Sequence, residues 1–353
     1  MLGTELLKGQ GFGNQLFCYV TTRCIARRNG YDFSILGRDI LGNDRYSQKG
    51  LYFMDLDMGK VSVKEDYESR YQEKEDRLFL PNSRHDLTHG AYVAGTDETL
   101  MQIPDNVLIG GNMQSQDYFR EYKEEIKEWL RVKPEYDSYE YSRENLCILN
   151  VRGGEYTSSP ELYLYKSYWI HAMRQMKKVR EDMEFLIVTD DVEAAEKLFP
   201  GIKALHGSLH EDYVRLKNAC YLILSNSSFA FFPAYTSTTL KLAIAPKYWA
   251  RHNVSDGYWS GEQNIYDEFT YMDRRGRLYT AGECREELAA YKKNERRFRH
   301  LNEKPEGFKL WRYKLWSRTY YGWCYLKKAG RGVIRRLRRH TGAKGSAEER
   351  ENG

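Results

Sequence analysis

The chain has 353 residues, 41% of them hydrophobic, so it can bury a sizeable core and is long enough for two domains. Its six cysteines include no CxxC pair, which argues against a cysteine zinc site and a dense disulfide framework and favours a reducing compartment. The net charge is a modest +5, and the absence of an N-terminal apolar segment or a run of eighteen apolar residues predicts neither a secretory signal nor a membrane-spanning helix.

The first part of the chain predicts an α/β unit with a long polar insertion. A strand over residues 4–7 leads into a glycine turn, and a helix over 14–28 ends at Gly30. The further elements expected in this part are a strand over 31–36, loops and short helices over 40–105, a strand over 106–110 and a helix over 118–132. Pro134 marks a domain boundary, because proline disfavours helix at the residue before it.

The second part alternates strands and helices. Strands are expected over 146–151, 184–189, 202–205 and 221–224, with a last strand over 240–245. Helices are expected over 165–179, 192–199 and 211–219. Alternation of this length favours a parallel, doubly wound sheet.

Four segments carry the polar groups that a sugar diphosphate needs. Residues 150–156, 189–191 and 225–229 each follow a predicted strand, and residues 11–15 open the first long helix. In an open α/β sheet, loops at the carboxyl ends of the strands converge on one crevice where ligands bind. An arginine, an acidic pair and a serine-rich turn in such a crevice indicate a bound nucleotide sugar.

Five blocks in the same order resemble the motifs of the family 11 glycosyltransferases, the α-1,2-fucosyltransferases. The blocks are residues 11–17 (GFGNQLF), 111–119 (GNMQSQDYF), 150–156 (NVRGGEY), 212–235 and 246–249 (PKYW). They extend over about residues 9–250.

The resemblance implies a GT-B-like fold, in which two Rossmann-like domains face a cleft. The acceptor-side domain would cover residues 1–134, the nucleotide-sugar domain 135–250, and an extension with a basic, aromatic tail 251–353. The implied activity is an inverting transfer of fucose from GDP-fucose to a hydroxyl of a cell-surface glycan precursor. No metal or other cofactor is implied.

Several positions depart from the family motifs. Asn150 stands where the family has a histidine that helps to hold guanine, Gly153 replaces a second arginine, and Glu155 replaces an aspartate. These departures leave two alternatives open: a transferase of the same fold with another nucleotide sugar, and a non-catalytic relative that binds nucleotides or glycans.

Arg152 is the arginine that the family assigns to the diphosphate of the donor. A planar guanidinium can meet two phosphate oxygens while negative charge grows on the leaving group. Glu155 is the candidate general base for the acceptor hydroxyl. A surface salt bridge for Arg152 and a structural ion pair for Glu155 remain the alternatives.

The other candidate residues would bind the donor, and each of three turns has a second explanation. Asp190 or Asp191 could bind a guanine edge or cap the next helix. Ser227 and Ser228 could bind phosphate or cap a helix. The glycine turn could bring backbone N–H groups to an anion or simply join a strand to a helix. The full donor-binding set is Gly11, Gly13, Asn14, Asn150, Asp190, Asp191, Asn226, Ser227, Ser228 and Phe229.

A D-x-D sequence at Asp55 and Asp57 could hold a hard cation, but this spacing is common by chance and we expect no metal.

The C-terminal region is strongly basic. Residues 307–346 contain twelve Lys and Arg and no Asp or Glu, and Trp316, Tyr320 and Trp323 fall on one helical face. Aromatic and basic side chains together are typical of an interfacial segment on an anionic membrane, so we expect a cytoplasmic enzyme on the inner face of the plasma membrane, acting on a glycan or a lipid-linked oligosaccharide. Packing of the tail on the globule is the alternative, and no recognition motif points to nucleic acid.

Overall fold

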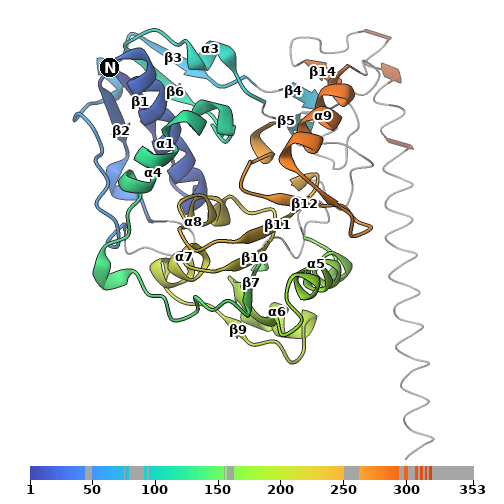
Figure 1. Ribbon diagram of the computed structural model, residues 1–353. Coiled ribbons are helices and arrows are strands. Elements are labelled where there is room, and N and C mark those ends of the chain that lie inside the picture. The colour runs from blue at the N-terminus through green and yellow to red at the C-terminus, as the bar shows by residue number, and fades with distance from the viewer. Residues whose placement is uncertain are drawn as a thin grey trace, which may run out of the picture. The chain divides into compact units, whose positions relative to one another are not determined.

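In a computed structural model of the chain, the described residues are 1–43, 50–74, 76–78, 91–93, 95–154, 156, 163–249, 262–293, 298–300, 307–308, 311–312, 315 and 318–319. The chain divides into two units, and Figure 1 labels their helices and strands. The first covers Met1–Asp76 and Val93–Glu295, and the second covers Arg77–Tyr92 and Arg296–Gly353.

The first unit contains a four-stranded parallel sheet near the N-terminus. Its strands are β2 (Phe33–Leu36), β1 (Leu2–Glu5), β6 (Val107–Gly110) and β3 (Ser69–Gln72), in that spatial order. Helix α1 (Phe12–Asn29) follows β1, and Gly30 ends it with φ 72°, a left-handed conformation that glycine adopts without steric cost.

A seven-stranded sheet forms the rest of this unit. Its spatial order is β13 (Leu278–Tyr279), β12 (Thr270–Met272), β11 (Leu242–Pro246), β10 (Tyr221–Leu224), β7 (Leu146–Val151), β8 (Glu184–Thr189) and β9 (Ala204–Leu205). All neighbours are parallel except the β12–β13 pair. The accompanying helices are α5 (Lys166–Val179), α6 (Val192–Leu198), α7 (Leu209–Lys217) and α8 (Phe231–Tyr235).

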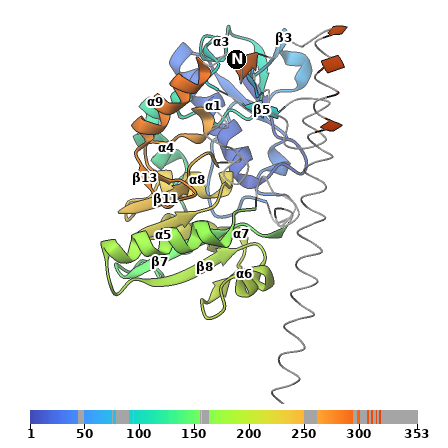
Figure 2. The same ribbon diagram turned by 90° about the vertical axis from the view of Figure 1, so that its right-hand side faces the viewer.

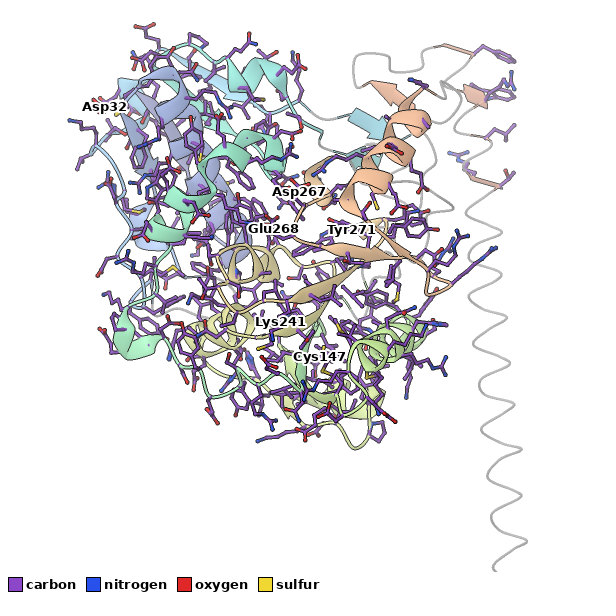
Figure 3. The ribbon with its side chains drawn as sticks, viewed as in Figure 1. Asp32, Cys147, Lys241, Asp267, Glu268 and Tyr271 are labelled. Atoms are coloured by element: carbon purple, nitrogen blue, oxygen red, sulfur yellow. The ribbon has the colours of Figure 1, made fainter. Side chains whose placement is uncertain are left out.

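Strand β7 is buried along its whole length and divides its side chains between two cores. Cys147 and Leu149 belong to the core under α5, which lies along this sheet in Figure 2, and Cys147 is labelled beside α5 in Figure 3. Ile148 belongs instead to a larger core that also contains α1, α7 and α8. A continuous apolar run is therefore expected for this strand, since helices cover both faces of a parallel sheet.

Short elements complete the described chain. In the first unit they are η1 (Arg38–Ile40), η2 (Lys64–Asp66), α3 (Glu98–Met101), η3 (Gln116–Tyr118), η4 (Arg120–Tyr122), α4 (Lys123–Trp129), η5 (Pro134–Tyr136), η7 (Ser228–Ala230), η9 (Glu262–Asn264) and α9 (Ala281–Lys292). A three-stranded sheet of β14 (Phe298–His300), β4 (Asp76–Leu78) and β5 (Ala91–Val93) belongs to the second unit. Within the described ranges, no helix has both the length and the apolar character that crossing a membrane requires.

The structure confirms the α/β class and the GT-B-like fold: the first unit holds one parallel sheet and one sheet that is parallel except at its β12–β13 edge. Strands β7, β8 and β10 have the predicted bounds. The division into domains at residues 134 and 250 stays a prediction, and Trp316, Tyr320 and Trp323 lie outside the described residues.

Three predicted elements were wrong. The helix over 118–132 is two 3₁₀ turns followed by the shorter α4, because Phe119 has a non-helical backbone at φ −139°. The strand at 240–245 is not the last, since β12 and β13 follow it. Residues 40–105 were predicted as loops and short helices, but they contain strand β3. Its side chains are mostly exposed and polar, so the sequence shows no apolar pattern that predicts this strand.

Candidate functional site

Three sequence-predicted segments meet at one edge of the seven-stranded sheet. The register pairs Val151 of β7 with Thr189 of β8, and Asn150 of β7 with Leu224 of β10. Arg152 therefore leaves the sheet between the acidic pair after β8 and the serine turn after β10. This edge holds the carboxyl ends of the strands, where α/β sheets bind their ligands.

Arg152 is held in place by Asp190. Its Nη1 lies 2.9 Å from Asp190 Oδ2, and the other oxygen of this carboxylate accepts a 2.7 Å hydrogen bond from the Gly153 backbone N–H. The arginine side chain is 20% exposed and the aspartate 7%. The guanidinium also lies 5.4 Å from the ring centre of Tyr156. The Arg152 guanidinium is thus fixed at the carboxyl-end edge of the sheet by a carboxylate that is almost buried.

The structure gives a steric reason for glycine at position 153. A Cβ atom there would lie 2.5 Å from the Cβ of Asp191. Asp191 caps α6 by accepting a 3.0 Å hydrogen bond from Ala194 N, and its other oxygen accepts one from Gly154 N at 3.3 Å. Of the two roles that the sequence left open for Asp191, the helix cap is present, and both acidic residues position the Arg152 loop.

The serine turn after β10 surrounds a buried asparagine. Ser225 Oγ donates to Asn150 Oδ1 over 3.2 Å, and the side chain of Ser227 caps η7 by accepting from Phe229 N. Asn226 lies between these two serines and is buried, yet neither its Nδ2 nor its Oδ1 has a hydrogen-bond partner among the described residues.

The glycine turn at the start of α1 lies against this serine turn. A Cβ atom on Gly13 would lie 2.4 Å from the Ser228 carbonyl carbon and 2.5 Å from Phe229 N, so only glycine allows this approach. Gly11 precedes the helix and supplies no side-chain cap, while Asn14 Oδ1 accepts from Gln114 Nε2 over 2.8 Å. The positive end of an 18-residue helix thus reaches the turn after β10.

Asp212 is a further acidic residue near this edge, which the sequence placed only within a motif. It follows β9 along the chain, accepts hydrogen bonds from Gly207 N and Arg215, and lies 3.0 Å from His206 Nδ1. Burial raises the pKa of its carboxyl group, and the contacts to His206 and Gly207 oppose that rise.

The remaining sequence candidates are Glu155 and the two aspartates of the D-x-D sequence. Glu155 lies outside the described residues. Asp55 forms an ion pair with Lys133 at 2.8 Å and Asp57 pairs with Arg23 at 3.5 Å, so different cations engage the two carboxylates of the D-x-D sequence. Among the residues with described positions, no three His, Cys, Asp or Glu side chains gather as metal ligands would.

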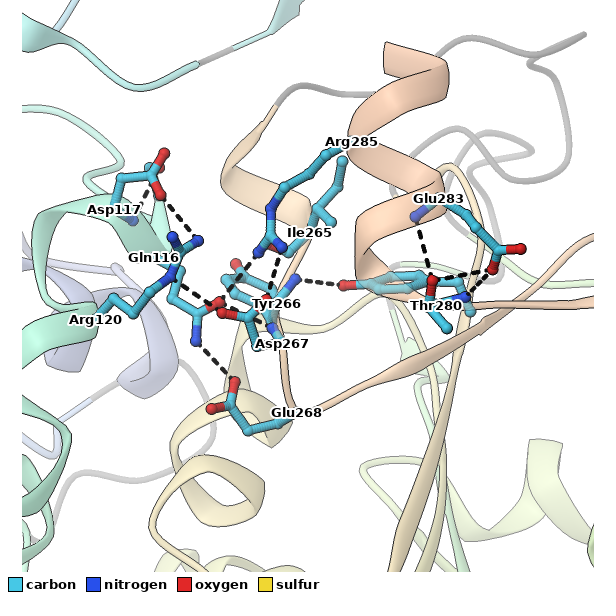
Figure 4. Close-up of polar contacts among 12 residues, drawn as sticks. Gln116, Asp117, Arg120, Ile265, Tyr266, Asp267, Glu268, Thr280, Glu283 and Arg285 are labelled. Atoms are coloured by element: carbon cyan, nitrogen blue, oxygen red, sulfur yellow. Dashed lines mark hydrogen bonds and ion pairs between the residues drawn. The ribbon is translucent and has the colours of Figure 1, made fainter. Parts of the chain in front are cut away.

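A polar cluster that we call the Gln116 network joins the two sheets in the first unit (Figure 4). Buried Gln116 donates to Glu268 and accepts from Asp267 N, and Lys123 lies 2.8 Å from Glu268. Its other members, Arg120 and Arg285, both pair with Asp267. Figure 3 labels Asp267 and Glu268 beside Tyr271 of β12. The sequence analysis included Gln116 in a motif block but did not predict this role.

Comparisons with known proteins agree with the sequence motifs. The family described as Glycosyl transferase family 11 matches residues 65–273. An Escherichia coli α-1,2-colitosyltransferase is 25% identical over 273 residues, which cover 68% of this chain and 89% of that protein.

Solved structures of a fucosyltransferase are similar at a low level. NodZ α-1,6-fucosyltransferase co-crystallised with GDP matches at a TM-score of 0.42 and 13% identity, over 79% of this chain and 97% of that one. NodZ from Bradyrhizobium matches at 0.39 and 12%, over 69% and 94%.

Proposed function

Because the chain belongs to glycosyl transferase family 11, we propose that this glycosyltransferase moves fucose from GDP-fucose to a hydroxyl of a cell-surface glycan precursor, with inversion at the anomeric carbon. The observation that carries the proposal is the pairing of Arg152 with Asp190 where β7, β8 and β10 end.

The proposed reaction is a single displacement. The acceptor oxygen forms a bond to the anomeric carbon while the bond from that carbon to the diphosphate breaks, and GDP departs with the electron pair. Arg152 neutralises the charge that develops on the leaving group, helped by the backbone N–H groups at the start of α1, where Gly11 supplies no side-chain cap. The proton of the acceptor hydroxyl passes to a base, for which we propose Glu155.

The remaining donor contacts are proposed for residues of the same edge and of the α1 turn. Gly153 N, bonded to Asp190, fixes the loop that presents Arg152. The proposed donor-binding residues are Gly11, Gly13, Asn14, Asn150, Asp190, Asp191, Asn226, Ser227, Ser228 and Phe229. Because Arg152 supplies the positive charge, the proposed reaction needs no metal cofactor.

A second candidate uses a different nucleotide sugar. The Escherichia coli relative is named for colitosyl transfer, and Asn150 and Gly153 depart from the motifs of the fucosyltransferases. A panel of nucleotides and nucleotide sugars in thermal unfolding separates the candidates, because a ligand that binds only the folded state raises Tm. Tight nucleotide binding without any transfer product would instead support a non-catalytic relative.

The test of the catalytic proposal is GDP release from GDP-fucose in the presence of candidate glycans. Arg152→Ala is expected to lower kcat by about 10²–10³-fold, the usual loss for one positioned donor to a developing anion. Arg143→Ala is the matched control. Arg143 precedes β7 and forms an exposed ion pair with Glu184, the first residue of β8, so it lies at the opposite ends of these strands from Arg152. Near-normal turnover by folded Arg152→Ala would remove Arg152 from the mechanism.

We also propose that the basic tail binds an anionic membrane surface and brings the enzyme to a lipid-linked acceptor on the inner face of the plasma membrane. In the second unit, Phe308, Trp311 and Leu315 recur at helical spacing and are 70%, 57% and 50% exposed. Aromatic side chains suit a membrane interface, and each nearby Lys or Arg adds about 1 kcal/mol of attraction. Truncation after Gly307 should reduce flotation with anionic liposomes at low salt, and unchanged flotation would contradict this proposal.

A further inference from the structure

Asn226 is a buried polar side chain whose hydrogen bonds are missing. The residue is 4% exposed, and within the described chain neither atom of its amide finds a partner. Its neighbours differ, since Ser225 donates to Asn150 and Ser227 caps η7. Buried amides in folded proteins are almost always bonded, so an unbonded one next to a binding edge indicates a ligand group.

The chemistry of the amide restricts what that ligand group can be. An asparagine side chain both donates through Nδ2 and accepts through Oδ1. A phosphate oxygen only accepts, so a diphosphate would leave Oδ1 without a donor. A sugar hydroxyl donates and accepts, and one or two hydroxyls can satisfy both amide atoms.

The position of Asn226 favours a group beside the diphosphate. By the β7–β10 register, Asn226 follows β10 at the level at which Arg152 follows β7. With Arg152 on the diphosphate, the neighbouring position faces a group that is directly attached to it. The ribose is attached to the α-phosphate and the transferred sugar to the β-phosphate. In the proposed reaction the charge that Arg152 neutralises develops on the β-phosphate, so the transferred sugar is the attached group nearer to Arg152.

We infer that Asn226 recognises hydroxyl groups of the transferred sugar and thereby determines donor specificity. This inference rests on the proposed donor site. It gives the two neighbouring residues different roles. Arg152 binds the diphosphate, which all nucleoside diphosphate sugars share, and Asn226 binds the sugar, in which these donors differ.

The test replaces Asn226 with leucine, which has a similar volume and no polar atoms. Dissociation constants are measured by calorimetry for GDP and for GDP-fucose. Asn226→Leu should bind GDP-fucose about tenfold more weakly, the loss expected for one or two neutral hydrogen bonds, and should bind GDP as the wild type does. The ligand-free variant should keep or raise its Tm, because leucine removes two polar atoms that have no partner.

Asn218→Leu is the matched control. Asn218 is 3% exposed, but its Nδ2 donates to Asp137 and to the Ser138 carbonyl. This variant should lose Tm and keep the wild-type ratio of the two dissociation constants.

The outcomes distinguish the inference from the donor site on which it rests. Equal weakening of GDP and GDP-fucose in Asn226→Leu would assign the amide to the ribose or the base and overturn the inference. Unchanged binding of both ligands, or a Tm loss as large as that of Asn218→Leu, would also overturn it while the donor site stands. A wild-type protein that binds neither ligand would overturn the donor site and the inference together.

Discussion

At the scale of single residues, close contacts explain several positions that the sequence left ambiguous. Asp190 contacts both the Arg152 guanidinium and the Gly153 N–H, so one carboxylate orients the side chain and the loop that carries it. Gly153 and Gly13 each lie where a Cβ atom would overlap a neighbouring segment. Their role is to let chain segments approach closely.

Substitution of Gly13 tests this role. Gly13→Ala should destabilise the fold by about 1–3 kcal/mol or more, because the new methyl group meets the rigid backbone of Ser228 and Phe229. Gly11→Ala is the matched control, since a Cβ atom on Gly11 has no neighbour within 4 Å and its φ of −65° suits alanine. Thermal unfolding of both variants measures the difference, and equal Tm values would contradict the close approach of α1 to the serine turn.

At the scale of elements, hydrogen-bonded caps fix where the helices of the second sheet begin. Asp191 caps α6, and the side chain of Glu211 accepts from Ser208 N over 2.7 Å at the start of α7. Helix α7 also carries Tyr213, whose ring packs against Phe12 of α1. A correct start of α7 therefore contributes to the packing of α1 over the candidate site.

Removal of the Glu211 side chain, which caps α7, should lower the stability of the fold by an amount that depends on pH. Hydrogen bonds from Ser208 lower the pKa of Glu211 below its usual value of 4.5, so its contribution is complete above that value and is lost as the pH falls through the lower, folded-state pKa. Glu211→Ala should cost about 0.5–1 kcal/mol at pH 7, the low part of the capping range because this side chain is partly exposed.

The measurement is Tm of both proteins from pH 7 down to the acid limit of folding. The difference in Tm between wild type and Glu211→Ala should become smaller below pH 4.5. Glu193→Ala, at an exposed glutamate of α6, should change Tm less. A gap that stays constant with pH would show that the carboxylate charge contributes nothing to the cap.

At the scale of the whole molecule, the two sheets of the first unit share one hydrophobic core and the Gln116 network. The core includes Phe17 of α1, Phe119, and Phe231 and Phe232 of α8, whose rings contact one another. The network links the turns after β6 to the segment before β12 and to α9. Both interactions hold the glycine turn and the strand-end loops in one unit.

Glu268 is the residue through which this link can be tested. Glu268→Ala removes the acceptor of both Gln116 and Lys123, and leaving these groups unpaired should cost about 1–3 kcal/mol. Glu128→Ala, which breaks an exposed ion pair with Arg131, should cost about 0–1 kcal/mol. Denaturant unfolding gives both values, and equal losses would mean that the network adds no more than a surface ion pair.

The sequence alone determined the features that depend on local patterns. The apolar runs of β7, β8 and β10 predicted these strands with their observed bounds, because buried parallel strands are continuously hydrophobic. The motif order predicted the family, and the strand-end rule predicted which loops would meet. The polar edge strand β3 and the broken helix at Phe119 escaped prediction, because tertiary pairing and a single backbone angle define them.

Only the tertiary structure decided which side chains contact each other within the site. It paired Arg152 with Asp190. It also showed that Asp191 occupies the space that a side chain at position 153, such as a second arginine, would need. It also left the Asn226 amide without a partner in the described chain, a fact that no spacing of residues could reveal. The physical reason is that hydrogen-bond satisfaction and steric room depend on segments up to about two hundred residues apart, such as Gly13 and Ser228, which meet only when both sheets have packed on a common core.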